Sequence, residues 1–405
     1  MDELSAIYMQ INEIDIEAFR SGQPPLNSEL LTKMTLGREL WLERVREYYL
    51  VNYIATGGSK VKVLVGNEGS GKTHLLRCIQ QDAKTLGYET VYLSARDCDD
   101  YRLNNLPSLY RAITQQIDKE RLVKGLCCCV ARQLGYTVDK YDATDLFISV
   151  LIEDTELPRD EAIRKIEKAA GKVFRNVDFG PSFRAFAYRV INNRMIGGNE
   201  KDIKLALEWL SGEKLERRER NDLLLFELLQ KTNARSWLNS LVRLLKIAGM
   251  TGLVVAIDDL EVITERSNET GRFIYTTNAI KDICELFRQL IDDVELLNNF
   301  LLLLAGRREM IEDEKRGFIS YDALWMRLQT GLVQKKFNPL ADMVDTDAHL
   351  EVSGSDFPSR VHTHLRQTLS EMGLELQYQG FPDLSQHSDL RARVIEVGMM
   401  IPKVG

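Results

Sequence analysis

The chain is poor in cysteine and histidine, with six cysteines and five histidines among 405 residues. Cys127, Cys128 and Cys129 are consecutive, so their thiols cannot surround one zinc ion tetrahedrally without contortion. His362 and His364 lie in a stretch with a helical pattern and have no further carboxylate or cysteine at ligand spacing. The sequence therefore predicts reduced, buried thiols and gives no indication of a transition-metal site.

Long apolar runs and an excess of positive charge are also missing. No apolar stretch approaches the roughly 20 residues that a membrane helix needs, and the acidic start MDELSAIYMQ lacks the regions of a signal peptide. Lys and Arg total 53 against 60 Asp and Glu, a formal net charge of -7. We therefore expect a cytoplasmic protein with no membrane segment, in which contact with DNA or RNA needs a local patch or a partner protein.

The composition that remains is that of a globular protein, 44% hydrophobic and 28% charged, long enough for two or three domains. The stretches KVKVLVG and ETVYLSA predict strands on either side of a glycine-rich loop and a helix from Thr73 to about Leu86. The apolar runs GLVVAIDDLE and NNFLLLLAGRRE predict two buried strands, and GLVQKKF at 331–337 a last one. A strand, loop, helix and strand in this order form a βαβ unit, so we expect a parallel, five-stranded sheet.

The loop after the first strand, GNEGSGKT, fits the pattern G-x-x-x-x-G-K-[ST] in full. Backbone N–H groups of such a loop and the N-terminus of the following helix surround phosphate groups. A dinucleotide-binding loop would instead need G-x-G-x-x-G. We predict that ATP is bound by Gly66, Asn67, Glu68, Gly69, Ser70, Gly71, Lys72, Thr73 and His74, with Lys72 acting on the β- and γ-phosphates and Thr73 on Mg²⁺.

Two carboxylates at the end of GLVVAIDDLE complete the predicted site. Asp258 would contact the hydration shell of Mg²⁺, and Asp259 would orient or deprotonate the attacking water. Alternatively, both carboxylates could cap a turn after the strand. Hydrolysing ATPases usually have Glu at the second place, so hydrolysis by Asp259 could be slow, or Glu261 could contribute.

Arginines follow the run FLLLLAG, which we expect to lie between the strand before the loop and the strand that ends in Asp258. Arg307 and Arg308 would then emerge beside the γ-phosphate. An arginine at this place can sense phosphate charge, although an ordinary surface arginine is the alternative.

Several stretches together resemble one family of ATPases. They are LGRE at 36–39, the glycine-rich loop, a long helical insertion, the segment from Trp237 to Glu261, and EKRGFISYDALWMRL at 314–328. In this order they resemble the P-loop ATPases of bacteriophage-exclusion (BREX-like) defence systems, the BrxC/BrxD-type ATP-binding family, which belong to the AAA-like, additional-strand division. The resemblance covers roughly residues 10 to 340. It implies an ATP-dependent component of a prokaryotic anti-phage system, acting beside a helicase or another DNA-processing partner. The aspartate at the second acidic place and the short C-terminal region are departures from the family pattern.

The resemblance also implies a site for the base of the nucleotide. Related ATPases place a turn like the one at Gly37 and Arg38 against the adenine, where the glycine lets the backbone approach the ring. The alternative is a helix N-terminus with no ligand contact.

Three further arginines are candidates for contact with ATP. In oligomeric relatives, an arginine placed like Arg327 reaches the γ-phosphate of a neighbouring subunit, so we expect a nucleotide-dependent homo-oligomer. An ion pair between Arg327 and residues 311–314 is the structural alternative, and Arg316 is the competing candidate. Arg391 faintly resembles the arginine that relatives carry on the lid helix.

We therefore expect an α/β P-loop NTPase fold of the AAA-like, additional-strand type with a helical insertion and a helical C-terminal region. The predicted segments are an N-terminal helix and linker (1–34), the two parts of the ATPase core (35–104 and 249–340), the insertion (105–248) and the lid-like C-terminal region (341–405). The predicted function is Mg²⁺-dependent ATP hydrolysis that drives assembly or remodelling of a defence complex, with DNA contacted directly or through the partner. A regulatory switch or scaffold with negligible hydrolysis is the alternative, which Asp259 favours; a small-molecule kinase is less favoured, because the insertion offers no obvious acceptor pocket.

Overall fold

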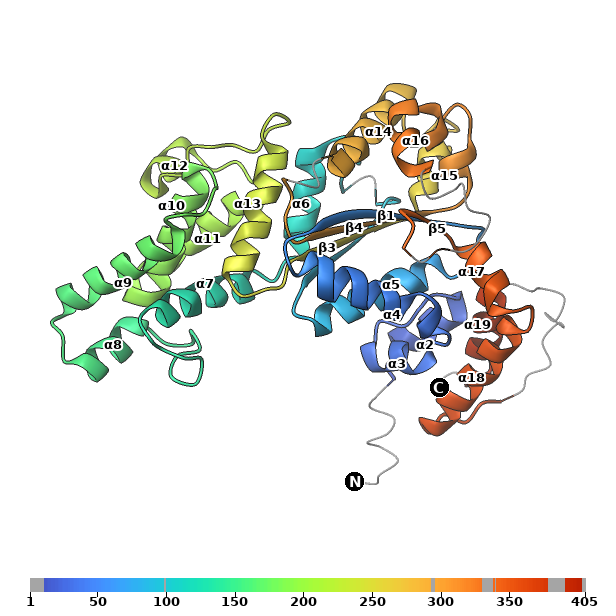
Figure 1. The fold of residues 1–405 in the computed structure, drawn as a ribbon, viewed down its shortest axis with the longest axis horizontal. Coiled ribbons are helices and arrows are strands. Elements are labelled where there is room, and N and C mark those ends of the chain that lie inside the picture. Colours follow the sequence, from blue (N-terminus) through green and yellow to red (C-terminus); the bar gives the residue numbers. More distant parts are fainter. Residues whose placement is uncertain are drawn as a thin grey trace.

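A parallel sheet of five strands lies at the centre of the molecule (Figure 1). The computed structural model describes residues 11–97, 100–292, 296–329, 338, 340–377 and 390–402. All strand pairs are parallel, in the order β2-β3-β4-β1-β5. The strands are β1 (Ser59–Val65), β2 (Glu89–Ser94), β3 (Leu253–Asp258), β4 (Phe300–Gly306) and β5 (Met343–Asp345).

The strand register brings the carboxyl ends of all five strands to one edge of the sheet. Val65 at the end of β1 is level with both Gly306 and Asp345, and Ser94 of β2 is level with Asp258 of β3. β4 lies between β1 and β3, so the residues that follow these three strands meet in one place. Open parallel sheets bind ligands at this edge.

The edge strand β5 differs from the strand that the sequence predicts. The expected strand at 331–337 lies outside the described residues, whereas β5 at 343–345 pairs with β1. The sheet therefore continues past the predicted boundary of the ATPase core at 340, and the predicted segment boundaries stay predictions.

Helices cover both faces of the sheet because its strands are apolar on both sides. Side chains of β1 alternate: Val63 and Val65 pack into one core and Leu64 into the other. Helix α5 (Lys72–Thr85) and the π-helix η3 (Val45–Ile54) cover the face of Leu64. The opposite face is covered by α6 (Leu106–Gln116), α13 (Ala234–Ile247), α14 (Thr277–Asp292) and α16 (Asp322–Leu328) (Figure 1).

A helical insertion extends away from the sheet, between α6 and α13 (Figure 1). Its aromatic rings pack together: Phe183 meets Trp237 edge to face with centroids 5.2 Å apart, and the rings of Trp209 and Trp237 are tilted with centroids 4.7 Å apart. The same apolar core continues to the sheet, so the insertion is packed against the sheet domain. Its elements are α7 (Lys119–Gln133), α8 (Phe147–Thr155), α9 (Arg159–Phe174), α10 (Pro181–Asn192), η4 (Asn193–Gly197), α11 (Glu200–Leu210) and α12 (Arg217–Leu223).

The two ends of the described chain build a third core, in which Phe19, Leu30, Leu365 and Val397 are buried. This core joins α2 (Glu13–Ser21) and α3 (Ser28–Met34) to α18 (Phe357–Glu371) and α19 (Leu390–Met399). The remaining helical elements are η2 (Arg38–Leu40), α4 (Leu42–Arg44), η5 (Leu260–Thr264), α15 (Glu309–Glu312), η7 (Phe318–Ser320) and α17 (Thr346–Ser353). Among the described residues we find no helix with the length and apolarity that a membrane crossing requires.

Candidate functional site

A cavity of about 450 Å³ opens where the carboxyl ends of β1, β3 and β4 meet. Its size falls within the roughly 300–1,000 Å³ of small-molecule sites. The glycine-rich loop and the residues after β3 and β4 line the inner part. Both ends of the chain line the outer part, through Gly22, Pro24, Met34, Thr35, Gly37, His349, Phe357, Val361, Leu390 and Val394. The cavity is therefore polar on the side of the sheet and largely apolar on the opposite side.

The glycine-rich loop is fixed to the start of α17. A Cβ atom on Gly66 would lie 2.0 Å from Oγ1 of Thr346, so only glycine fits there without displacement. The Thr346 hydroxyl donates to the carbonyl of Val65 at 3.1 Å and lies 2.6 Å from Oγ of Ser70. Gly71, with φ +88°, turns the chain into α5 in a backbone conformation that other residues rarely adopt. Contacts with β1 and α17 thus hold the loop in its curved shape.

Lys72 lies inside this loop at the first position of α5. Its Nζ donates to the carbonyls of Asn67 at 2.7 Å and Gly66 at 3.1 Å. Burial lowers the pKa of Lys72, and the carboxylate of Glu261 opposes that shift. The ammonium group thus borders the cavity, bound to backbone oxygens where phosphate oxygens would be stronger acceptors.

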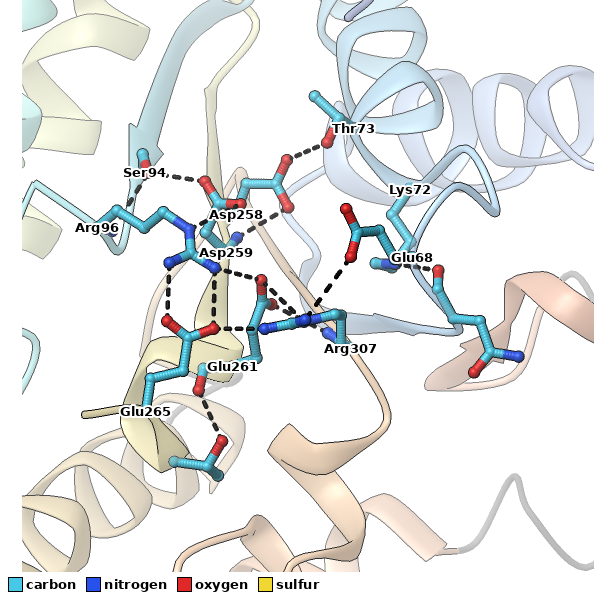
Figure 2. A network of polar contacts seen from close by, with 12 residues as sticks. Glu68, Lys72, Thr73, Ser94, Arg96, Asp258, Asp259, Glu261, Glu265 and Arg307 are labelled. Atoms are coloured by element: carbon cyan, nitrogen blue, oxygen red, sulfur yellow. Dashed lines mark hydrogen bonds and ion pairs between the residues drawn. The ribbon is translucent and has the colours of Figure 1, made fainter. Parts of the chain in front are cut away.

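Asp258 ends β3 and is only 2% exposed. One carboxylate oxygen accepts hydrogen bonds from the Thr73 hydroxyl at 2.7 Å and the Tyr92 hydroxyl at 2.9 Å. The other oxygen accepts from the backbone N–H of Asp259 at 2.9 Å. Burial raises the pKa of Asp258, and the neighbouring charge of Asp259 raises it further. Arg77 stacks on the Tyr92 ring at 3.5 Å and so fixes one of these three donors. Figure 2 shows the contact between Thr73 and Asp258.

Asp259 points toward the end of β2. Its backbone is left-handed, with φ +60°, a conformation that aspartate tolerates better than most residues. Its carboxylate accepts a hydrogen bond from the Ser94 hydroxyl at 2.7 Å and lies 3.6 Å from Nε of Arg96. The two consecutive acids therefore lie at the same edge of the cavity and have different partners.

Two arginines and two glutamates form a network beside these acids (Figure 2). Arg96 donates to Glu261 at 2.9 Å and to Glu265 at 2.8 Å. Arg307 forms an ion pair with Glu265, and its backbone N–H donates to Glu261 at 3.0 Å. The hydrogen bond from Arg96 lowers the pKa of Glu265. Arg307 also lies 3.7 Å from Glu68 of the loop, so the network reaches the predicted phosphate site.

Most of the sequence-predicted residues come together around this cavity. It is lined by Glu68, Gly69, Ser70, Gly71, Lys72, Thr73, His74, Gly37, Asp258, Asp259, Glu261, Arg307 and Arg391. Gly37 has φ +69° and faces the Phe357 ring at the outer part of the cavity. Nε2 of His74 lies 3.1 Å from the Thr35 hydroxyl. Arg391 of α19 crosses to the loop and forms an ion pair with Glu68.

Other sequence-predicted residues lie outside the lining. Gly66 and Asn67 do not line the cavity, and their carbonyls accept hydrogen bonds from Nζ of Lys72. Arg38 donates to Asp82 of α5 at 2.6 and 2.8 Å, and Arg308 binds Asp345 at the end of β5 and Asp347 in α17. Arg316 is buried and donates to the carbonyls of Ile263 and Tyr275. Arg327 is ion-paired with Asp292 of α14, rather than with the acidic residues at 311–314.

Sequence reasoning missed Arg96, Tyr92 and Asp347. Tyr92 lies in β2 and Arg96 two residues after it, and the position of β2 beside β3 follows from the sheet order and not from a motif. Asp347 accepts a hydrogen bond from the backbone N–H of Asn67 at 3.0 Å and so helps to anchor the loop. The only available signal was that Arg96 closely follows a predicted strand, at the edge where ligands bind.

Comparison with protein families supports the ATP-binding interpretation of the glycine-rich loop. A family model described as BREX system ATP-binding protein BrxC/D matches residues 10–351. The matched range runs from α2 to α17 and includes all five strands, the glycine-rich loop and Asp258. No curated protein sequence matches the chain.

Proposed function

Because this chain belongs to the family of BREX system ATP-binding proteins BrxC/D, we propose that it is a Mg²⁺-dependent ATPase of a BREX anti-phage system. Membership of an ATP-binding family supports ATP as the ligand. The observation that carries the proposal is the pair formed by the Thr73 hydroxyl and the Asp258 carboxylate, 2.7 Å apart beside Lys72. These are the groups that P-loop ATPases use for the metal and the phosphates.

The residues at the end of β3 fit Mg²⁺ and not a transition metal. Mg²⁺ takes oxygen ligands, keeps several waters and needs only one or two protein groups besides the phosphates. Thr73 and Asp258 supply a hydroxyl and a carboxylate. In the described part of the chain, no three His, Cys, Asp or Glu side chains are arranged to hold a metal by themselves. When bound, Mg²⁺ neutralises charge on the β- and γ-phosphate oxygens.

We assign the attacking water to Asp259. Glu261 is bound by the Arg96 guanidinium and by the Arg307 backbone N–H, so both of its oxygens already have N–H partners. Asp259 has one oxygen bonded to Ser94, while the other lies 3.6 Å from Arg96, beyond hydrogen-bond distance. That second oxygen can accept a hydrogen bond from water. In this scheme Lys72 exchanges its carbonyl partners for phosphate oxygens, and Arg307 contributes a second cation near the γ-phosphate.

The coupling of nucleotide state to a larger complex is part of the same proposal. β4 lies between β1 and β3, which favours the AAA-like, additional-strand type of ATPase. The cavity is lined by α19 and by the linker between α2 and α3, so bound ATP would join both ends of the chain to the sheet. We propose that ATP binding and hydrolysis change how these ends are held against the sheet. This change would act in the cytoplasm on a helicase or another DNA-processing subunit of the system.

Two variants test the proposal. We expect Lys72→Ala to weaken binding of a fluorescent ATP analogue at least tenfold and to abolish phosphate release, because the loop loses its cation. Asp258→Asn should keep nucleotide binding in EDTA but lose the stimulation of phosphate release by Mg²⁺. Lys84→Ala is the matched control, since Lys84 lies exposed at the far end of the same helix.

A switch or scaffold that binds ATP with negligible hydrolysis is the second candidate, and the aspartate at position 259 favours it. Phosphate release should be measured with and without duplex DNA and partner subunits. If wild-type protein never exceeds the Lys72→Ala background while it still binds ATP, the ATPase proposal fails and the switch remains.

A further inference from the structure

Charge is distributed unevenly along the chain. Residues 105–248, which comprise the helical insertion and its flanking helices α6 and α13, contain 25 Lys and Arg against 20 Asp and Glu, a net charge of +5. The whole chain carries -7, so the rest carries -12. Anions are therefore attracted to this basic region and repelled by the acidic remainder of the protein.

Within the insertion, helix α9 concentrates this positive charge on one face. Five cations are exposed there: Arg164, Lys165, Lys168, Lys172 and Arg175, which is the C-terminal cap. We call this set the α9 basic face. Positions four residues apart lie on the same side of a helix. The opposite side, with Ala162, Ile166, Ala169, Ala170 and Phe174, is buried in the insertion.

The cations of the α9 basic face have no anionic partners among the described residues. None of them forms an ion pair, although α8, which packs on α9, has exposed acids at Glu153, Asp154 and Glu156. Two exposed acids also lie along these cations on α9: Glu161, one turn before Arg164, and Glu167, one turn after it. Helix α12 differs, because its Arg218 pairs with Asp222 at 4.0 Å. Five cations without ion pairs, against these two acids, leave the face with an excess of positive charge.

We propose that the α9 basic face binds the phosphate backbone of double-stranded DNA without reading its sequence. From Arg164 to Arg175 the helix rises roughly 16 Å, at 1.5 Å per residue. One strand of B-DNA carries a phosphate every 3.4 Å along the axis, so about five phosphates occupy that length. Five cations on one face match this number. The face lies in the part of the insertion that extends away from the sheet, where it is accessible to a duplex (Figure 1).

The chemistry of the face fits a nucleic acid better than an acidic protein. Protein interfaces depend on large buried anchors, mainly aromatic residues and arginine, surrounded by packed apolar groups. The exposed large hydrophobic side chains that lie nearest in sequence to α9 are Leu146 and Leu224, outside the helix on either side. A face of lysines and arginines without an apolar anchor gains binding energy by releasing counterions from phosphates.

The test uses the full chain without ATP and a fluorescein-labelled 30-bp DNA duplex, with anisotropy measured between 50 and 200 mM salt. The variant Lys165→Gln/Lys168→Gln/Lys172→Gln removes three charges from the face. The control Lys201→Gln/Lys204→Gln/Lys214→Gln removes the same charge from exposed positions elsewhere in the insertion. We expect the α9 variant to bind at least tenfold more weakly at 100 mM salt. Its slope of log K against log salt should fall in magnitude by about 2–3, and the control should stay within twofold of wild type.

Three results would overturn the proposal: no binding of the duplex by wild-type protein at 50 mM salt, an equal loss in both variants, or no loss in the α9 variant. Polyglutamate that competes as well as DNA at equal charge would assign the face to acidic proteins instead. Phosphate release from ATP in the absence of DNA should equal wild type in both variants. A failure of the DNA assay is thereby separated from a failure of the proposed ATPase.

Discussion

Arg96 is the side chain through which β2 contacts the acids that follow β3. It is 44% exposed at its side chain, lines the cavity, and is held by Glu261 and Glu265. A guanidinium fixed in this way is preorganised to meet phosphate oxygens in a bidentate fashion, which a lysine cannot reproduce. Together with Arg307 it places two fixed cations beside the loop.

We therefore predict that Arg96→Ala lowers kcat for ATP hydrolysis at least tenfold while KM changes less than threefold. Arginines that stabilise charge during phosphoryl transfer contribute roughly 10³–10⁵ in rate. Arg96→Lys should recover little of the loss. Arg102→Ala, which removes an arginine stacked 5.7 Å from the Tyr275 ring, is the control. Steady-state phosphate release decides the outcome: a raised KM with unchanged kcat would mean that Arg96 only helps to bind ATP.

At the scale of elements, the contact between the glycine-rich loop and α17 joins β1 to β5. Gly66→Ala places a Cβ against the Thr346 hydroxyl, which is itself bonded to Ser70 and Val65. We expect this change to cost roughly 1–3 kcal/mol of stability, as overpacking does, and to lower the thermal midpoint and the affinity for ATP together.

A second substitution, at Thr346, tests whether the clash with its hydroxyl causes this loss of stability. Thr346→Ala removes the hydroxyl and should restore part of the lost thermal midpoint in the Gly66→Ala background. Thr346→Ser keeps the hydroxyl and should restore nothing. Equal rescue by both, measured by differential scanning calorimetry, would show that the clash is not the cause.

The sequence predicts those elements whose signal is local. β3 and β4 contain runs of five or more apolar residues that end in an acid or glycine, and β1 is a valine-rich stretch directly before the glycine-rich loop. The parallel five-stranded sheet is confirmed. β5 has only three residues, MVD, and is a strand because β1 offers an unpaired edge. Arg96 and Tyr92 belong to the site because β2 lies beside β3, which is a property of the sheet order. Arg38 and Arg327 bind acidic residues on α5 and α14, respectively. These partners are distant in sequence, so spacing along the chain does not predict them.

At the scale of the whole molecule, the position of Arg327 bears on assembly. It lies on α16, outside the cavity, where Asp292 of α14 accepts a hydrogen bond from its guanidinium at 2.8 Å. Arg327 therefore acts on ATP only if it reaches a second copy of the chain, and the resemblance to oligomeric ATPases predicts that it does.

We predict that Arg327→Ala binds ATP with near-normal affinity but loses turnover. Asp292→Asn is the matched control, because it removes the ion pair and leaves the arginine in place. Mixing Arg327→Ala with Lys72→Ala protein should restore part of the activity at shared interfaces. Normal hydrolysis by Arg327→Ala, or a wild type that stays monomeric by mass photometry with ATP and its partner at micromolar concentration, would contradict the prediction.

The cavity is lined by residues from both ends of the chain, from Gly22 to Gly37 and from His349 to Val394, and these ends share one apolar core. Ribosomes add about 5–20 residues per second, so roughly 20–70 s separate the synthesis of Gly37 from that of Leu390. During that time the glycine-rich loop exists without the opposite wall of its cavity. A nascent chain therefore cannot enclose ATP, and the nucleotide cycle can begin only after translation has passed α19.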